Sequence, residues 1–400
     1  MFSQPDFVRL WVAGLATFTV RWIEVLAISV FVYQQTGSEL IVAIMMMWRV
    51  LPMALFGAFL GAWSDRIERR SALLLILLIS LATSLGIGLL AAAGRLEIWH
   101  LGAASFVNGI AWCSDNPVRR NLMSQVVGRA RLGAAMAVDV GSNNASRVLG
   151  PSLGGLLLVQ WGIEGVFFCG ALIYLLGLVA AFRVTYRNEP RDGASANILR
   201  QVADGWREAC SNDQLRGIFA ITFLFNLFCW PTISLIPVIG ESALHLSPEW
   251  VGILSSADGV GTLAGALFIG TLAPQRWFGP MFVGGAVIYP ALMAVFAMTV
   301  EPISAGAALV AVGIGAAGFS VMQATLVLTA TPPPLRGSVL GLLSVCIGVA
   351  PMGLLLIGAV ARAIGAPGAV IAFGVLGAAT IIATYPVWRA VWRGEPAPAG

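Results

Sequence analysis

The sequence predicts an all-helical membrane protein with twelve transmembrane helices, and three observations carry that prediction. The 400-residue chain is 58% hydrophobic and only 10% charged, whereas soluble domains carry about a quarter charged residues. Its apolar stretches are each about 20 residues long, which is the length that crosses a hydrocarbon core of about 30 Å. Its arginines are concentrated in alternate connecting loops. An ordinary soluble protein is therefore excluded.

The apolar stretches follow one another and leave almost no chain for a soluble domain. They cover residues 9–33, 39–62, 71–93, 98–117, 134–159, 163–182, 216–239, 250–272, 278–299, 302–329, 338–361 and 367–388. The first stretch has the length of a transmembrane helix and no small-residue cleavage pattern. We therefore expect it to remain as a helix and not to be a cleaved signal peptide.

The charges indicate how the helices are oriented. The chain has 23 arginines and no lysine, and 18 of them fall in loops on the side of the N-terminus. The opposite loops hold only Arg95 and Arg362. Because basic loops face the cytoplasm, both termini are expected there, in a multi-pass protein of the bacterial inner membrane. The net charge of +4 then reflects topology and gives no reason to expect a nucleic-acid partner.

A polar interval divides the apolar stretches six and six. We expect an N-terminal six-helix bundle over 1–183, a cytoplasmic linker over 184–215 and a C-terminal six-helix bundle over 216–400. Residues 198–206 of the linker are interpreted either as a short amphipathic helix on the membrane surface or as flexible chain. A Gly-Pro pair in the fifth stretch and an Ala-Pro pair in the eleventh suggest that the halves are two parallel repeats.

Several kinds of chemistry are not indicated. The five cysteines lack the spacing of a zinc site or of a disulfide framework, so neither a metal nor another cofactor is predicted. No nucleophile cluster and no phosphate-binding loop occurs, which argues against an enzyme and against a nucleotide-driven pump. The expected partners are a small-molecule substrate, the lipid bilayer and protons, and the protein is expected to be a monomer.

Charged side chains inside the apolar stretches are the candidate functional groups. Each costs at least about 2.5 kcal/mol in a bilayer, so it faces a cavity or a partner. Arg21 and Glu24 share one helix face, which makes Glu24 either a proton carrier or half of a fixed ion pair with Arg21. Asp258 has no partner close in sequence and is either a second proton site or a hydrogen-bonded structural group.

A polar stripe runs along the fifth stretch, where Asp139, Asn143 and Arg147 recur every four residues. We interpret the stripe as a cavity lining, with Arg147 as a substrate or gating residue and Arg49 in the second stretch in a similar role. Asn108 either contacts substrate or bonds another helix. Small residues continue the stripe and favour close helix packing; they are Gly150, Pro151, Gly154 and Gly155.

Arginines outnumber acids among these mid-membrane groups. A shared cavity would therefore be mildly positive and would suit an anionic or zwitterionic, partly aromatic substrate.

The loop between the second and third stretches carries the most specific motif. It reads Gly61-Ala-Trp-Ser-Asp65-Arg66-Ile-Glu68-Arg69-Arg70. The run resembles the signature Gly-x-x-x-Asp-Arg-x-Gly-Arg-Arg/Lys of major facilitator superfamily transporters, with Glu68 in place of the second glycine. Further motifs resemble the enterobactin-exporter and macrolide-efflux branch; they are Arg49-x-x-Pro52, Pro117-x-Arg119-Arg120 and Asn144-x-x-Arg147-x-x-Gly150-Pro151.

The resemblance implies the major facilitator fold and alternating access. It also implies a cytoplasmic gate formed by Gly61, Asp65, Arg66, Arg69, Arg70 and Asp115. In that gate, Asp65 caps the eleventh helix and Arg66 or Arg69 pairs with Asp115. The fourth stretch has Ser105 where many drug–proton antiporters have an arginine.

We therefore expect a secondary transporter that exports a small amphipathic compound such as a drug or siderophore, with proton antiport as one mode of coupling. The alternatives are an importer or facilitator of the same fold and a non-transporting membrane scaffold or sensor.

Overall fold

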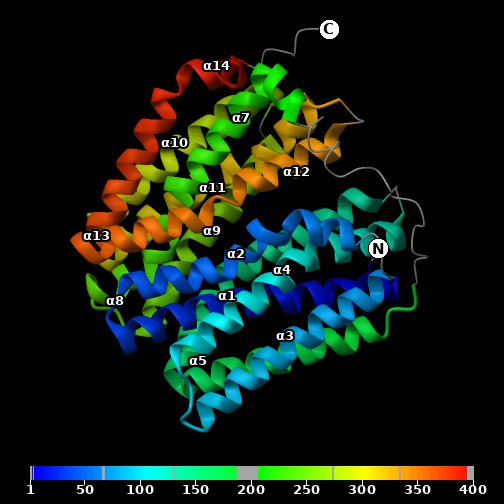
Figure 1. Cartoon of the computed structure of the whole chain (residues 1–400), viewed down its shortest axis with the longest axis vertical. Helices are drawn as coiled ribbons and strands as arrows, with labels where there is room; N and C mark the ends of the chain where they lie inside the picture. Colours follow the sequence, from blue (N-terminus) through cyan, green and yellow to red (C-terminus); the bar gives the residue numbers. More distant parts are fainter. Residues whose placement is uncertain are drawn as a thin grey trace. The chain divides into compact units, whose positions relative to one another are not determined.

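The computed structural model describes residues 2, 4–64, 68–128, 131–186, 206–272, 274–332 and 335–393, and every regular element in these ranges is helical (Figure 1). The chain divides into two compact units. The first comprises Met1–Ala194 and His245–Ser256, and the second comprises Ser195–Leu244 and Ala257–Gly400.

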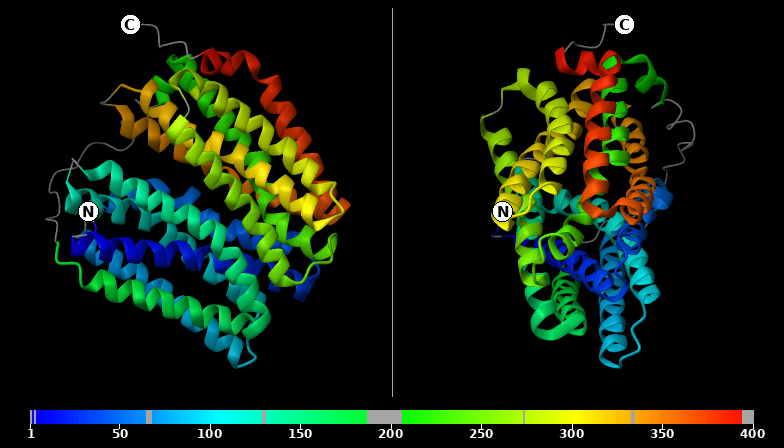
Figure 2. Two further views of the ribbon diagram at one scale, coloured as in Figure 1. Left: turned by 180° about the vertical axis from the view of Figure 1, so that it is seen from behind. Right: turned by 90° about the vertical axis from the view of Figure 1, so that its left-hand side faces the viewer.

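Five long helices build the first unit. They are α1 (Pro5–Thr36), α2 (Glu39–Ser64), α3 (Arg69–Ala92), α4 (Ile98–Val127) and α5 (Leu132–Phe182). Helix α1 packs against α5, α5 against α3, and α2 against α4, as the two views in Figures 1 and 2 show. Each of these helices therefore buries one face against a neighbour, which is the arrangement that positions the polar groups described below.

Helix α5 is twice the length of a single membrane-spanning helix because it is broken at one glycine. Gly162 has φ 65° and ψ −173°, a backbone conformation outside the helical region that only glycine adopts without strain. The break separates residues 132–161 from 163–182, which correspond to the predicted fifth and sixth stretches.

Irregular helix begins the second unit. Helix α7 (Asp213–Leu224) passes into a π-helical turn (Phe225–Cys229), a 3₁₀ helix (Trp230–Leu235) and α8 (Ile236–Ser242). Prolines inside this segment cannot donate a backbone hydrogen bond, which accounts for the change of helix type. The predicted seventh stretch is therefore helical but not a uniform α-helix.

The remaining helices follow the order of the apolar stretches. They are α9 (Pro248–Leu272), α10 (Phe278–Ala297), α11 (Pro302–Ala330), α12 (Arg336–Ile347), α13 (Ala350–Ala383) and α14 (Tyr385–Arg393), with a short 3₁₀ turn (Gln275–Trp277) before α10. Helices α10 and α11 pack together, as do α10 and α13 (Figure 2). Helix α13 is broken at Gly365, which has φ 79°.

Within the described residues, nine helical segments are long and apolar enough to cross a membrane. Two of them are the long segments of α5 and α13, each of which contains a glycine break. Helix α4 is 30 residues long but is not among the nine. Its polar residues lower its hydropathy, and two of them, Asn108 and Asp115, belong to the site described below.

The ends of two helices differ clearly from the sequence prediction. Helix α4 continues to Val127 instead of ending at residue 117. The last long helix ends at Ala383, before the predicted residue 388, and α14 follows as a separate short helix. The Trp388 indole donates to the Ile381 carbonyl at 2.6 Å, which fixes this corner. The predicted amphipathic helix at 198–206 lies outside the described residues except for residue 206, which belongs to a described helical segment, 206–211.

Candidate functional site

The centre of the first unit holds a fully buried carboxylate. Glu24 of α1 is 0% exposed and accepts hydrogen bonds from three other helices. Arg49 of α2 donates twice, at 3.3 and 3.4 Å, Asn108 of α4 donates at 3.0 Å, and the Ser84 hydroxyl of α3 donates at 2.7 Å. The carboxylate of Glu24 therefore joins α1 to α2, α3 and α4 through hydrogen bonds from their side chains.

The partner of Glu24 differs from the one expected. Arg21 lies on the same face of α1, but its guanidinium extends between aromatic rings, 4.8 Å from the centroid of Trp112 and 5.2 Å from that of Phe18. Arg49, which comes from another helix, makes the ion pair instead. Helical spacing alone could not reveal this, because the competing partners lie on α2 and α4.

The close approach of α4 to α2 brings the Asn108 and Arg49 donors to Glu24. A Cβ atom added to Gly109 of α4 would clash with the backbone carbonyl of Arg49 in α2. Only glycine at this position therefore lets the two helices meet there. The neighbouring residue Asn108 and the Arg49 side chain are thereby brought to the same carboxylate.

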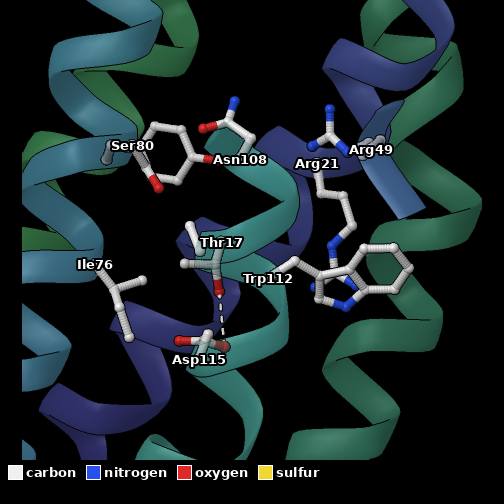
Figure 3. A pocket seen from close by; sticks show the side chains of 10 residues that line it. Thr17, Arg21, Arg49, Ile76, Ser80, Asn108, Trp112 and Asp115 are labelled. Carbon is white, nitrogen blue, oxygen red and sulfur yellow. Dashed lines mark hydrogen bonds between the residues drawn. The ribbon is translucent and has the colours of Figure 1, made fainter. Parts of the chain in front are cut away.

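A small cavity lies beside this ion pair. Its volume is about 20 Å³, room for one water molecule. Figure 3 shows Arg21 beside the Trp112 ring and the hydrogen bond between Thr17 and Asp115 at 3.4 Å. The cavity is lined by Thr17, Arg21, Arg49, Ile76, Ser80, Asn108, Ala111, Trp112, Asp115 and Tyr174.

A second buried charge cluster joins α4 to α5. Arg119 is 0% exposed and forms ion pairs with Asp115 on its own helix, at 3.2 Å, and with Asp139 of α5. Arg120 also binds Asp139, at 2.9 Å, with a side chain that is 40% exposed. The guanidinium of Arg119 also lies 4.7 Å from the centroid of the Phe18 ring.

This cluster corrects two expectations. The sequence pattern assigned Arg119 to a loop, whereas two carboxylates neutralise it inside the helix bundle. Asp139 was expected to line a cavity with Asn143 and Arg147, but it is 0% exposed and held by two arginines. Sequence reasoning missed Arg119, although its spacing of four residues from Asp115 was a usable signal.

Arg147, further along the stripe on α5, contacts α1. Arg147 is half-buried, with its guanidinium 5.5 Å from the centroid of the Trp22 ring. Asn143 is half-buried on the same helix. Added Cβ atoms on Gly150 and Gly154 would collide with Trp22 and Ile23, so these glycines lie against α1 and do not form an open groove.

The predicted gate is only partly within the described residues. Asp65 and Arg66 lie outside them, and Gly61 belongs to α2 without a described environment. Arg69 is buried at the start of α3, and Arg70 donates to the Phe182 carbonyl at 2.7 Å. Asp115 is bound by Arg119 and Thr17. The expected pairing of Asp115 with Arg66 lies outside the described residues, and the pairing with Arg66 or Arg69 stays a prediction.

Asp258 lies in the second unit. It belongs to α9 and is 2% exposed. Thr262 donates to its backbone carbonyl at 2.9 Å. Among the described residues of both units, no group of three or more His, Cys, Asp or Glu side chains could hold a metal ion.

The long apolar helices, with charged side chains buried between them, are those of a membrane protein. The family model of the Major Facilitator Superfamily matches residues 10–354, and the chain belongs to this family. It is therefore a multi-pass membrane transporter and not an enzyme.

Curated relatives agree at low identity. The chain is 21% identical over 259 residues to macrolide efflux protein A of Streptococcus pyogenes, a match covering 64% of each chain. It is 25% identical over 162 residues to an uncharacterized MFS-type transporter of Bacillus subtilis, covering 40% of this chain and 38% of the relative. The expected resemblance to the macrolide-efflux branch is thereby confirmed at the level of sequence similarity.

Solved structures confirm the fold. A POT family transporter in complex with 5-aminolevulinic acid aligns over 96% of both chains with a TM-score of 0.77 at 13% identity. A bacterial homologue of the human lysosomal transporter Spinster, in an inward-facing conformation, aligns over 99% of this chain and all of its own with a TM-score of 0.72 at 16% identity.

Proposed function

We propose that this transporter exports a small amphipathic compound and that proton binding at Glu24 drives the export. The observation that carries the proposal is the Glu24–Arg49 ion pair, buried among four helices beside a water-sized cavity. The similarity to macrolide efflux protein A supports export as the direction of transport.

The proposed coupling follows from the hydrogen bonds. Ionised Glu24 restrains Arg49 through two bonds. A proton on Glu24 removes the charge that these bonds depend on, so Arg49 would be released to contact an anionic group of the substrate. Proton and substrate would then favour different positions of Arg49, which is the differential interaction that any coupled conformational change requires.

The arrangement of the helices in the membrane and three further functional regions are also proposed. We propose twelve helices in two parallel repeats, divided at the linker 184–215, with both termini cytoplasmic and alternating access between the two bundles. Arg147 is proposed as a substrate or gating residue, and Asp258 as a second protonation site. The loop 61–70 is proposed as the cytoplasmic gate.

Everted membrane vesicles test the direction and the substrate class. An anionic dye, a cationic dye and a labelled macrolide serve as probes, and uptake into these vesicles reports export. Uptake of the anionic dye that falls in Arg147→Ala supports the proposed positive cavity. Transport of cations alone contradicts it. Uptake only into right-side-out vesicles indicates an importer, and no transport of any probe favours a scaffold or sensor.

A further inference from the structure

An apolar groove lies on the surface of the first unit between α3 and α5, two helices that pack side by side (Figures 1 and 2). Its volume is about 800 Å³. Several of its large apolar side chains are exposed, which makes a continuous surface that an apolar partner would cover. The groove is lined by Ser71, Leu74, Leu75, Leu78, Leu178, Val179, Phe182 and Arg183.

The groove is polar at one end and apolar along the rest of its length. Helix α3 begins at Arg69 and α5 ends at Phe182, and both belong to segments that are long and apolar enough to cross a membrane. Ser71 and Arg183 therefore lie where the two helices leave the hydrocarbon, whereas Leu78 lies about 10 Å further along α3. A matching ligand is polar or charged at one end and apolar over a similar length.

Two arginines stand at the polar end. Arg183 lines the groove with an exposed side chain. The guanidinium of Arg70 donates to the carbonyl of the neighbouring Phe182 at 2.7 Å and lies 5.6 Å from the centroid of the Phe182 ring. Both of these contacts of Arg70 are with neutral groups, so they do not compensate its charge.

The carboxylates near this end do not outnumber the arginines. Asp6 is paired with Arg9 at 2.7 Å. Glu68 accepts a hydrogen bond from the Ser71 hydroxyl at 2.6 Å and supplies one negative charge beside the two arginines. The described residues at this end therefore favour a ligand whose polar part is an anion.

We propose that the groove binds one anionic phospholipid, with its phosphate at Arg183 and Arg70 and an acyl chain along Leu75 and Leu78. A small soluble anion would leave the apolar length of the groove uncovered, and an uncharged apolar molecule would leave the arginines without a counter-charge. Anionic lipid head groups are attracted to arginines at the membrane surface. This is a specific lipid site, and it rests neither on the direction of transport nor on its coupling to protons.

Thermal unfolding of the purified protein in detergent tests the class of ligand. The probes are phosphatidylglycerol, phosphatidylcholine with the same acyl chains, and glycerol phosphate. A ligand that binds the folded state raises the unfolding temperature, and we expect this of phosphatidylglycerol. Phosphatidylcholine should need at least five times the concentration for the same rise, and glycerol phosphate should give none. An equal response to either of these two probes would overturn the proposal.

Replacing one arginine tests the position of the head group. Arg183→Gln should raise the half-saturating concentration of phosphatidylglycerol about fivefold, the loss expected for one arginine beside an anionic lipid. Arg95→Gln, at an exposed arginine in the loop after α3, is the matched control and should leave that concentration unchanged. Equal responses of the two variants would mean that the lipid does not bind at Arg183.

Filling the groove tests the position of the acyl chain. Leu75 is 46% exposed inside the groove, and Leu85, on the same helix but outside the groove, is 42% exposed. Leu75→Trp should therefore weaken the response to phosphatidylglycerol at least threefold, whereas Leu85→Trp should not change it. An unchanged response in Leu75→Trp would contradict the proposal.

Electron cryomicroscopy of the wild type in nanodiscs of phosphatidylglycerol gives an answer that depends on no variant. Density for a phosphate within hydrogen-bond distance of Arg183, continuing as a chain past Leu75, is expected. A helix of a second copy in the groove, or no lipid density there, would refute the site.

Discussion

Arg119 shows how a buried charge can hold helices together in this protein. Its guanidinium is fully enclosed and is shared between Asp115 on α4 and Asp139 on α5. Loss of one partner from a buried ion pair leaves an uncompensated charge, which is far more costly than loss of an exposed pair. Buried Arg119 and partly exposed Arg120 both bind Asp139. Replacing each in turn therefore compares the stability that a buried ion pair and an exposed ion pair contribute at one carboxylate.

We expect Arg119→Gln to lower the free energy of unfolding by about 3 kcal/mol, because it leaves two buried carboxylates without their arginine. Arg120→Gln should cost about 0.5 kcal/mol, since its side chain is 40% exposed. Thermal unfolding of the purified variants measures both. Equal losses would mean that burial does not decide the strength of these pairs.

For single residues, the sequence predicts the identity of the buried polar groups better than it predicts their hydrogen-bond and ion-pair partners. Glu24, Arg49 and Asn108 were each singled out, and the structure brings them together. Their pairing depends on contacts among α1, α2 and α4, and a single sequence gives no register between helices. Arg119 was missed because a run of arginines at the end of an apolar stretch is typical of a cytoplasmic loop.

Among the helices, the contact of α4 with α2 determines the geometry of the site. Gly109 faces the Arg49 carbonyl at a distance that leaves no room for a side chain. Gly102, two turns earlier on α4, faces Met45 and Trp48 of α2, where an added Cβ would be 3.6 Å from its nearest atom. The two glycines lie in one interface, but only one is required by close approach.

Gly109→Ala should therefore destabilise the protein by about 2 kcal/mol and reduce transport, because α4 must move away from α2 and separate Asn108 from Glu24. Gly102→Ala should be neutral or stabilising by up to about 1 kcal/mol, since alanine favours the helix. Unfolding and vesicle transport measured together test this. A neutral Gly109→Ala would show that the approach of these helices is not required.

The positions of the helices are predictable, because each long helix coincides with an apolar stretch that is visible in the hydropathy of the sequence. The stretches 39–62 and 71–93 correspond to α2 and α3 within a few residues. The changes of helix type after α7 and the corner between α13 and α14 were not predicted. The changes of helix type follow prolines, whose effect on an apolar helix depends on its neighbours. The corner is fixed by a single hydrogen bond of the Trp388 indole, which leaves no trace in an apolar pattern.

For the whole molecule, the distribution of arginines predicts the orientation in the membrane. Cys210 is exposed, and its position in the predicted cytoplasmic linker makes it a reporter. The other four cysteines are half-buried or buried, so their replacement by serine or alanine leaves one labelling site.

In that background, a membrane-impermeant maleimide should label Cys210 only after the membrane is opened, because the linker is proposed to face the cytoplasm. A variant with Arg95→Cys added and Cys210 replaced should be labelled in intact cells, since Arg95 is predicted to lie in a loop on the opposite side of the membrane. Labelling of Cys210 in intact cells would reverse the proposed topology.

The family follows from the sequence and the fold, whereas the substrate does not. The structural relatives carry different compounds on one architecture, so the fold by itself names no cargo. What distinguishes this chain is the polar centre of its first unit, and the proposed coupling depends on it.

Proton-driven uptake into everted vesicles, measured with the dye or macrolide probes under an imposed pH gradient, tests that coupling most directly. An acidic interior should stimulate uptake by the wild type and by Glu39→Gln, a carboxylate near the start of α2 that serves as control. Glu24→Gln should show at least a tenfold smaller response to the gradient, while its expression and unfolding show that it is folded. A Glu24→Gln variant that keeps the full gradient response would contradict the account.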